Sequence, residues 1–255
     1  MTPSSNLGTE RTSGGEMKTG HSLPDLLPPE FALAELDAQD DPESTVTDGR
    51  VARGLRTRRN VAEALIELLR EGDQEPTARA VAQRAGVSLR LVFHHFTEMD
   101  DLYHYVAALQ LRRQWSDMPR ISSKLALPTR IERTIAHRAA LYEELSPIRR
   151  ALARRIPASR GVAATIAAAD TLLLEDLKVT FEPELAALGA NTRLEVLEAM
   201  DVATSWEAWE RLRTSSLLQS RGARRVMTRL LESLCAPGAG SRRGAHTGVP
   251  VVDAS

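Results

Sequence analysis

The amino-acid sequence predicts an all-α protein in which a three-helix unit is followed by a longer helical region. Apolar residues recur at the helical spacing i, i+3 and i+4 through almost every segment between residues 49 and 234. No segment shows the alternation of apolar and polar residues that marks a half-buried strand. Proline and glycine divide the chain into pieces of helical length. The hydrophobic content of 42% over 255 residues is sufficient for a buried core.

The two ends of the chain differ in composition from the middle. Residues 1–48 contain two basic and ten acidic residues, a net charge of −8, and are rich in Ser, Thr, Gly and Pro. Such a segment buries too little apolar surface to offset the entropy of ordering, so we expect a disordered acidic arm. We also expect a disordered tail at 236–255. Between the two we predict domains at 49–112 and 113–235.

The first full helix is expected over residues 49–70. Its apolar stripe buries one face against a core, and the stripe comprises Val61, Ala64, Leu65, Leu68 and Leu69. Four arginines lie at the N-terminal end of this helix: Arg53, Arg56, Arg58 and Arg59. Positive charge there opposes the helix dipole, so we expect these arginines to face an anionic partner. Residues 50–96 carry nine arginines against five acids, a net charge of +4, which fits contact with phosphate.

Residues 77–96, TARAVAQRAGVSLRLVFHHF, have the pattern of two short helices joined by a tight turn. Thr77 and Ser88 are suited to cap the two helices, because a hydroxyl can accept a bond from a first-turn N–H. Gly86 stands where the first helix ends and the backbone needs a positive φ. Small Ala82 allows the two helices to cross closely, as a helix-turn-helix requires.

The rest of the chain is expected to be helical as well. A fourth helix follows over 97–115, and then Pro119 and Pro128 mark a connection with a short helix around Ile121–Leu127. Proline, glycine and asparagine separate the further helices, which we expect at 129–145, 147–156, 159–179, 183–188, 191–217 and 220–234.

Four stretches of the sequence carry a specific resemblance. They are Thr57-Arg58-Arg59 at the start of a helix, AVAQRAGVS at 80–88, LVFHHF at 91–96, and Asp100-Asp101-Leu102 at the start of the next helix. Together they resemble the DNA-binding domain of the TetR family of transcriptional repressors, over residues 55–112. The resemblance implies a homodimeric regulator, in the first place a repressor, that binds a palindromic double-stranded DNA operator and is released by an unidentified small-molecule effector. Two positions depart from the family pattern, because Phe93 replaces a tyrosine and Met99 replaces a lysine that contact the DNA backbone.

The helix-turn-helix gives a set of candidate DNA contacts. Its second helix lies in the major groove, where Arg90 can bond bidentately to guanine and Leu89 can meet a thymine methyl. Arg79, on the preceding helix, is the second candidate for contact with bases. Other side chains contact phosphate and position the domain without reading the sequence. The full set of candidates is Arg58, Arg59, Thr77, Arg79, Ser88, Leu89, Arg90, Phe93 and His94.

The C-terminal run from Leu194 to Leu234 holds more apolar surface than one helical hairpin can bury within its own chain. Two such hairpins packed face to face, as the resemblance also implies, would form a four-helix dimer interface. The dimer candidates are Trp209, Leu217, Met227, Leu230 and Leu234. The resemblance further implies an effector pocket in the second domain, with candidate lining residues Trp115, His137, Tyr142, Thr171 and Trp206. For the two tryptophans of the hairpin, packing in the core is the alternative.

Other function classes have no motif in the sequence. No HExxH, CxxC, P-loop, GxSxG or GxGxxG occurs, and the six histidines lack metal-ligand spacing, so we expect no enzyme, metal or cofactor. The single cysteine, Cys235, excludes an internal disulfide. The absence of an apolar run of about 18 residues and of a signal-peptide core predicts a soluble cytoplasmic protein without a membrane partner. The alternative function is a helical ligand-binding or protein-interaction module without operator binding, whose basic end the acidic arm covers.

Overall fold

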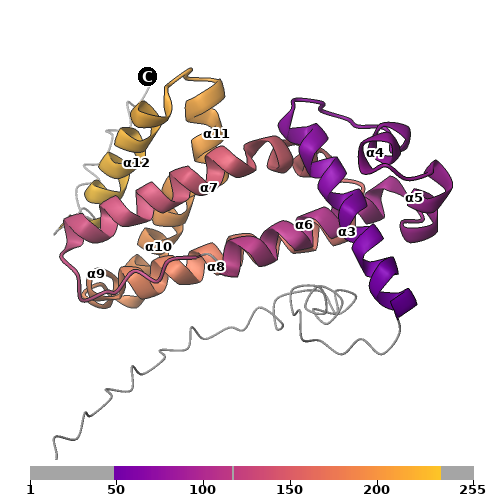
Figure 1. The fold of residues 1–255 in the computed structure, drawn as a ribbon. Helices are drawn as coiled ribbons and strands as arrows, with labels where there is room; N and C mark the ends of the chain where they lie inside the picture. Colours follow the sequence, from indigo (N-terminus) through magenta and orange to yellow (C-terminus); the bar gives the residue numbers. More distant parts are fainter. Residues whose placement is uncertain (1–48, 117, 237–255) are drawn as a thin grey trace, which may run out of the picture.

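The computed structural model describes residues 49–116 and 118–236, and every regular element among them is an α-helix (Figure 1). The predicted all-α class is therefore confirmed. The acidic arm, and all but the first residue of the expected C-terminal tail, lie outside the described residues. No described helix is long and apolar enough to cross a membrane.

Three helices gather at one end of the molecule: α3 (Gly49–Arg70), α4 (Ala78–Ala85) and α5 (Leu89–His95) (Figure 1). The Thr77 and Ser88 hydroxyls each accept a backbone N–H at 3.2 Å and cap α4 and α5, as predicted. Gly86 ends α4 with a φ of 66°, a left-handed conformation that glycine adopts without steric cost. The inward faces of the three helices share a core that includes Val61, Leu65, Val81, Val92 and Phe96.

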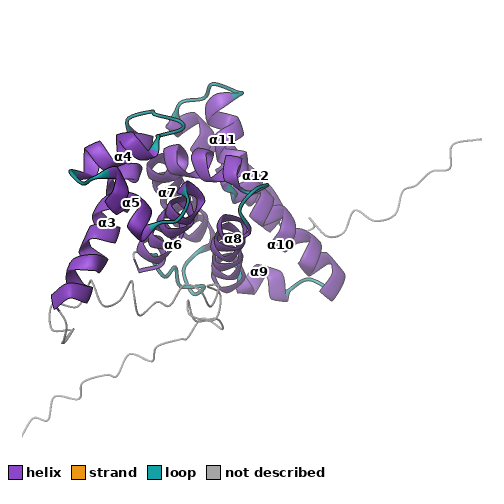
Figure 2. Cartoon of the chain, turned by 90° about the vertical axis from the view of Figure 1, so that its right-hand side faces the viewer, coloured by secondary structure: helices purple, strands orange, loops and turns teal. Residues whose placement is uncertain are grey.

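Three longer helices extend from this end along the molecule. They are α6 (Met99–Ser116), α7 (Leu127–Arg155) and α8 (Arg160–Thr180), and Figure 2 shows them nearly end-on. Ile148 and Leu152 of α7 and Val162 of α8 belong to the same core as the inner face of α3. The three-helix end is therefore packed against the long helices without an intervening polar layer.

Two expectations for the middle of the chain were wrong. Pro147 does not separate two helices but lies inside α7. A proline in a helix removes one backbone hydrogen bond, and the burial of Ser146 and Ile148 on either side holds α7 together across it. The stretch around Ile121–Leu127 is not a short helix. Residues 121–126 form a loop with one turn, in which the Leu125 N–H donates to the Ser122 carbonyl at 3.2 Å, and Leu127 already begins α7.

The other end of the molecule is formed by α9 (Glu182–Ala186), α10 (Ala190–Thr204), α11 (Trp206–Thr214) and α12 (Ser220–Cys235) (Figure 1). The single helix expected over 191–217 is broken at Ser205. The backbone of this serine is extended and its hydroxyl accepts the Ala208 N–H at 3.1 Å, so that it starts a new helix as an N-cap. A second core fills this end and includes Tyr142, Met200, Trp209, Met227 and Leu231.

Candidate nucleic-acid interface

The outer face of α5 exposes the side chains that the sequence predicts for it. Leu89 and Phe93 keep 38% and 46% of their surface exposed, although both are large and apolar. Arg90 and His94 are exposed on the same helix, while Val92 turns into the core. Apolar side chains beside an arginine at this position of a helix-turn-helix are suited to contact base edges in a groove.

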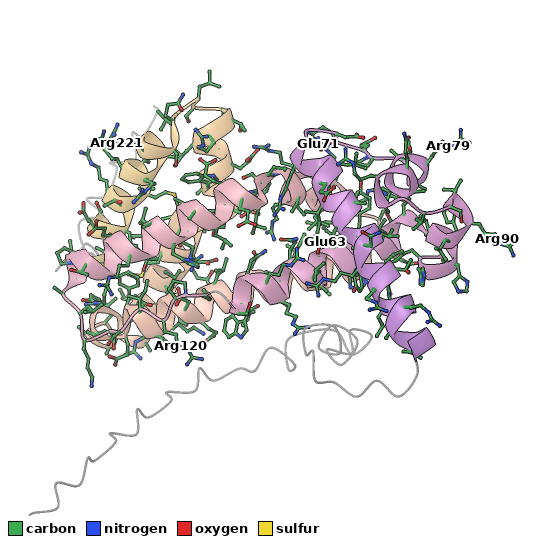
Figure 3. All side chains as sticks on the ribbon, viewed as in Figure 1. Glu63, Glu71, Arg79, Arg90, Arg120 and Arg221 are labelled. Atoms are coloured by element: carbon green, nitrogen blue, oxygen red, sulfur yellow. The ribbon has the colours of Figure 1, made fainter. Side chains whose placement is uncertain are left out.

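Arg79 and Arg90 point outward at the end of the molecule formed by α4 and α5 (Figure 3). Neither forms an ion pair or hydrogen bond with any described residue. The two guanidinium groups therefore present uncompensated positive charge to whatever lies beyond this end.

The N-terminal end of α3 adds two more such charges. Arg53 and Arg56 are exposed there and, within residues 49–116 and 118–236, their guanidinium groups have no acidic or hydrogen-bonding partner. This end of α3 lies beside α5, since a Cβ added at Gly54 would be 3.9 Å from the His95 ring. Arginines without a side-chain partner thus come from α3, α4 and α5, the three helices of this end. We call these four the exposed arginine set: Arg53, Arg56, Arg79 and Arg90.

Arg84 of α4 shows that the chain neutralises other arginines of the same unit. Its guanidinium donates to the carboxylate of Glu71, directly after α3, at 2.6 and 3.0 Å and lies 3.4 Å from the carboxylate of Glu67 on α3. This hydrogen bond lowers the pKa of Glu71. The remaining acid of α3, Glu63, accepts from Arg113 of α6. The carboxylates of α3 are therefore occupied, and none is available to the exposed arginine set.

Arg58 and Arg59 were predicted as DNA contacts, and the structure shows both guanidinium groups beside partners of their own chain. The Arg58 guanidinium lies over the rings of Phe96 and Tyr105, at 5.2 and 4.8 Å from their centroids, which is a cation–π arrangement. Arg59 Nε lies 3.8 Å from the Glu63 carboxylate. The sequence groups them with Arg53 and Arg56, because helical position alone does not show which arginine meets an aromatic pair.

The remaining predicted contacts sit at the edges of the exposed face. Thr77 and Ser88 are exposed, and although their hydroxyl oxygens accept the capping bonds, each hydroxyl retains a proton to donate to phosphate. His94 is exposed, whereas His95 is half-buried. Burial, followed by the charges of His94 and Arg58, lowers the pKa of His95, which favours a neutral imidazole against the core.

Two of the five predicted pocket residues, Trp115 and His137, line a small cavity between α6, α7 and α8. The other three use their polar atoms within the chain. The Tyr142 hydroxyl donates to a backbone carbonyl of α10 at 2.9 Å, the Trp206 indole donates to a buried serine of α7 at 3.2 Å, and the Thr171 hydroxyl donates to the carbonyl one turn earlier at 2.8 Å. None of these three lines that cavity or the neighbouring one between the same helices.

The predicted dimer residues divide into two groups. Trp209 and Met227 are fully buried in the core of their own chain, so their assignment to a dimer contact was wrong. Leu217 and Leu230 are 80% and 45% exposed, and Leu234 is half-buried. Three further exposed apolar residues of the same run lie on α10 and α12, outside the short set of dimer candidates: Leu194, Val202 and Val226.

The described residues contain no group of three or more His, Cys, Asp and Glu side chains that could hold a metal ion. The single cysteine is buried, and burial raises the pKa of the Cys235 thiol to about 12. A thiol held in its neutral form is a poor nucleophile.

Comparison with known proteins gives a similarity of fold. The crystal structure of a transcriptional regulator from Rhodococcus sp. Rha1 superposes with a TM-score of 0.56 at 16% sequence identity, covering 69% of this chain and 95% of that one. A candidate transcriptional regulator from Pseudomonas aeruginosa PAO1 gives a TM-score of 0.49 at 18% identity, covering 71% and 91% of the two chains. No family model and no curated protein matches the sequence. The Rhodococcus structure therefore shows that the helical fold is shared.

Proposed function

We propose that this chain is a TetR-like homodimeric transcriptional regulator that represses by binding a palindromic DNA operator. The observation that carries the proposal is the exposed arginine set: Arg53, Arg56, Arg79 and Arg90. Uncompensated basic side chains gathered on a helix-turn-helix unit are the electrostatic footprint of nucleic-acid binding. The fold shared with the Rhodococcus regulator supports the same function.

Within this proposal the four arginines have two roles. Arg90 reads a base in the major groove, with Leu89 against a thymine methyl and Arg79 beside it. Arg53 and Arg56 contact phosphates and fix the position of the unit on the duplex. Phe93 places its ring at the backbone without the hydroxyl of a tyrosine, which leaves more of the phosphate contact to the arginines of α3.

The dimer is proposed to form through the end of the molecule opposite the exposed arginine set. Exposed apolar residues on α10, on α12 and in the loop before α12 would be covered by the same surface of a second copy: Leu194, Val202, Leu217, Val226 and Leu230. A two-fold dimer presents its two recognition helices to half-sites ~34 Å apart, one turn of the duplex.

Release by a small-molecule effector is proposed to act through the long helices. Residues 49–112 would form the DNA-binding domain and 113–235 the dimerisation and effector-binding domain. At the junction, Arg155 of α7 donates to Asp100 at 2.7 Å and Arg154 donates to the Gln74 side chain at 2.7 Å. An effector that favours a different position of α7 would shift the dimer towards a state whose recognition helices no longer match the two half-sites.

The experiment that tests the proposal is selection of binding sites from random duplex DNA with the full chain. We expect a palindromic consensus, and we expect Arg79→Ala/Arg90→Ala to lose it. Arg84→Ala is the matched control, because it removes an arginine of α4 that the chain already neutralises. Selection of no consensus, or equal losses in the double variant and the control, would contradict the proposal.

A further inference from the structure

A cavity of about 50 Å³ lies between α6, α7 and α8. A second cavity of about 20 Å³ adjoins it on the same three helices. Leu111, Gln114 and Ala169 line both, so these side chains form the partition between them. Gln114 is only half-buried and has a long, flexible side chain, so its movement would join the two spaces.

Gln110 of α6 lines the larger cavity and is 4% exposed. Its amide nitrogen is buried and has no hydrogen-bond partner, and its side chain forms no hydrogen bond with any described residue. Its neighbours in the cavity wall are mainly apolar and include Ile148, Leu152 and Ile166. Buried polar groups are nearly always hydrogen-bonded, so an unpartnered amide facing an apolar cavity indicates a binding partner that the chain itself does not supply.

The charged group in the wall of the larger cavity is already compensated. Arg149 donates to the Asp170 carboxylate at 3.1 and 3.2 Å, lies 3.4 Å from the Glu207 carboxylate and stacks over the Trp206 ring. Two carboxylates therefore balance one guanidinium, and an anionic ligand would have to displace one of them.

The other polar groups of the two cavities are neutral or occupied. The Thr165 hydroxyl donates to the Gly161 carbonyl at 3.0 Å. In the smaller cavity, burial and the charge of Arg138 lower the pKa of His137, which disfavours its cationic form. The cavities thus offer a ligand apolar wall and neutral hydrogen-bonding groups, and among these groups the Gln110 amide is the one buried without a partner.

We propose that the joined cavity binds an uncharged, mainly apolar small molecule with one carbonyl or hydroxyl group, which pairs with the Gln110 amide. This inference rests on the proposed function in one respect, since it assigns the chemical class of the proposed effector. The combined space is about half of the ~150 Å³ of a cavity that holds benzene. About three non-hydrogen atoms of the ligand therefore enter, with its carbonyl or hydroxyl end first.

The position of the cavity connects binding to the DNA-binding end. Ile148 and Leu152 line the cavity and belong to the core that α3 shares with α7. One turn beyond them, Arg155 holds Asp100 at the start of α6. A ligand between α6 and α7 therefore separates the two helices that carry this ion pair.

The test uses ligand-observed NMR on the full chain without DNA, with cyclopentanone as the probe. Cyclopentanecarboxylate and cyclopentylammonium, which have the same ring, are the charged comparisons. We expect millimolar binding of the ketone and at least tenfold weaker binding of both ions. Gln110→Leu keeps the volume and removes the amide, and we expect it to weaken ketone binding at least fivefold. Gln83→Leu, at an exposed glutamine of α4, should leave it unchanged.

Several results would overturn the inference: no ketone binding, tighter binding of either ion, or unchanged ketone binding by Gln110→Leu, which would mean that the amide meets only water. If Gln110→Leu does not fold, Ala107→Leu fills the same cavity from α6 and must abolish ketone binding. Because no DNA is present, these results are independent of operator binding. Site selection that succeeds without ketone binding contradicts this inference alone, and the reverse outcome contradicts the proposed function alone.

Discussion

Arg84 of α4 and Glu71, the residue directly after α3, form a two-pronged ion pair, with N–O distances of 2.6 and 3.0 Å. Arg79, five residues earlier on the same helix, has no partner among the described residues. One helix therefore carries one arginine that serves the fold and one that does not. Because exposed ion pairs contribute little to stability, substitutions at these arginines can be compared for DNA binding without large differences in folding.

Arg90→Ala is expected to weaken binding to the selected operator by about 1–3 kcal/mol and to relax the sequence preference at one position of each half-site. A guanidinium that reads a base contributes to specific binding, so affinity for random DNA should change little. Fluorescence anisotropy with both duplexes measures the two affinities, and Arg84→Ala serves as the control. An equal loss on both duplexes would remove Arg90 from the base-reading role.

Arg53→Ala and Arg56→Ala are expected to behave differently from Arg90→Ala. A side chain that contacts phosphate releases counterions, so each substitution should weaken binding to operator and random DNA alike. Each should also reduce the slope of log K against log[salt] by about 1. Titrations between low and moderate salt measure the slope. An unchanged slope in both variants would place the N-terminal end of α3 away from the DNA.

Leu230→Glu is expected to shift the protein from dimer to monomer and to weaken operator binding, because a charge would be buried in the proposed interface. Val179→Glu is the matched control, since Val179 is similarly exposed, at 44%, but lies on α8. Sedimentation velocity measures the dimer fraction at several concentrations. If the unsubstituted chain is monomeric at operator-binding concentrations, the dimer part of the proposal is lost.

Gly161→Ala is expected to lower the free energy of unfolding by about 1–3 kcal/mol, the usual cost of overpacking. A Cβ at this position would lie 2.4 Å from the imidazole ring of His104, where α8 begins against α6. Gly54→Ala is the control inside α3, where the nearest atom is 3.9 Å away, and it should raise stability by about 0.5–1 kcal/mol. Urea denaturation gives both values. Combining Gly161→Ala with His104→Ala should recover most of the loss, and failure to recover it would place the cost elsewhere.

The local features of the helix-turn-helix could be predicted from the sequence because they depend on neighbours in the chain. The Thr77 and Ser88 caps and the left-handed Gly86 are set within four residues, and all three are confirmed. Features that depend on distant residues could not be predicted in this way. Whether Arg58 faces DNA or the rings of Phe96 and Tyr105 is decided by how α3 packs on α6.

The same distinction holds at the other end of the molecule. An apolar run predicts that a surface will be buried, but it does not say by which chain. Trp209 and Met227 are covered by α7 and α10 of their own chain, while Leu217 and Leu230 of the same run stay exposed. The sequence could not predict the unpartnered amide of Gln110 either, since the residues around it come from α7 and α8, far along the chain.

Removal of residues 1–48 is expected to strengthen binding to DNA, because this segment carries a net charge of −8 and ends where the exposed arginine set begins. If the arm occupies those arginines, DNA must displace it, and a coupling of about 1–3 kcal/mol would raise the affinity of the shortened chain by about 5- to 150-fold. The gain should shrink as salt rises, since added ions screen the attraction.

A full-length variant with Asp37, Asp40, Asp41 and Glu43 replaced by the corresponding amides keeps the length of the segment, so it shows the effect of the charge apart from that of the segment's size. Gel shifts on the selected operator compare the three proteins. Strong binding only after removal or neutralisation supports masking, equal binding by all three excludes it, and no binding by any of them favours a helical module without an operator.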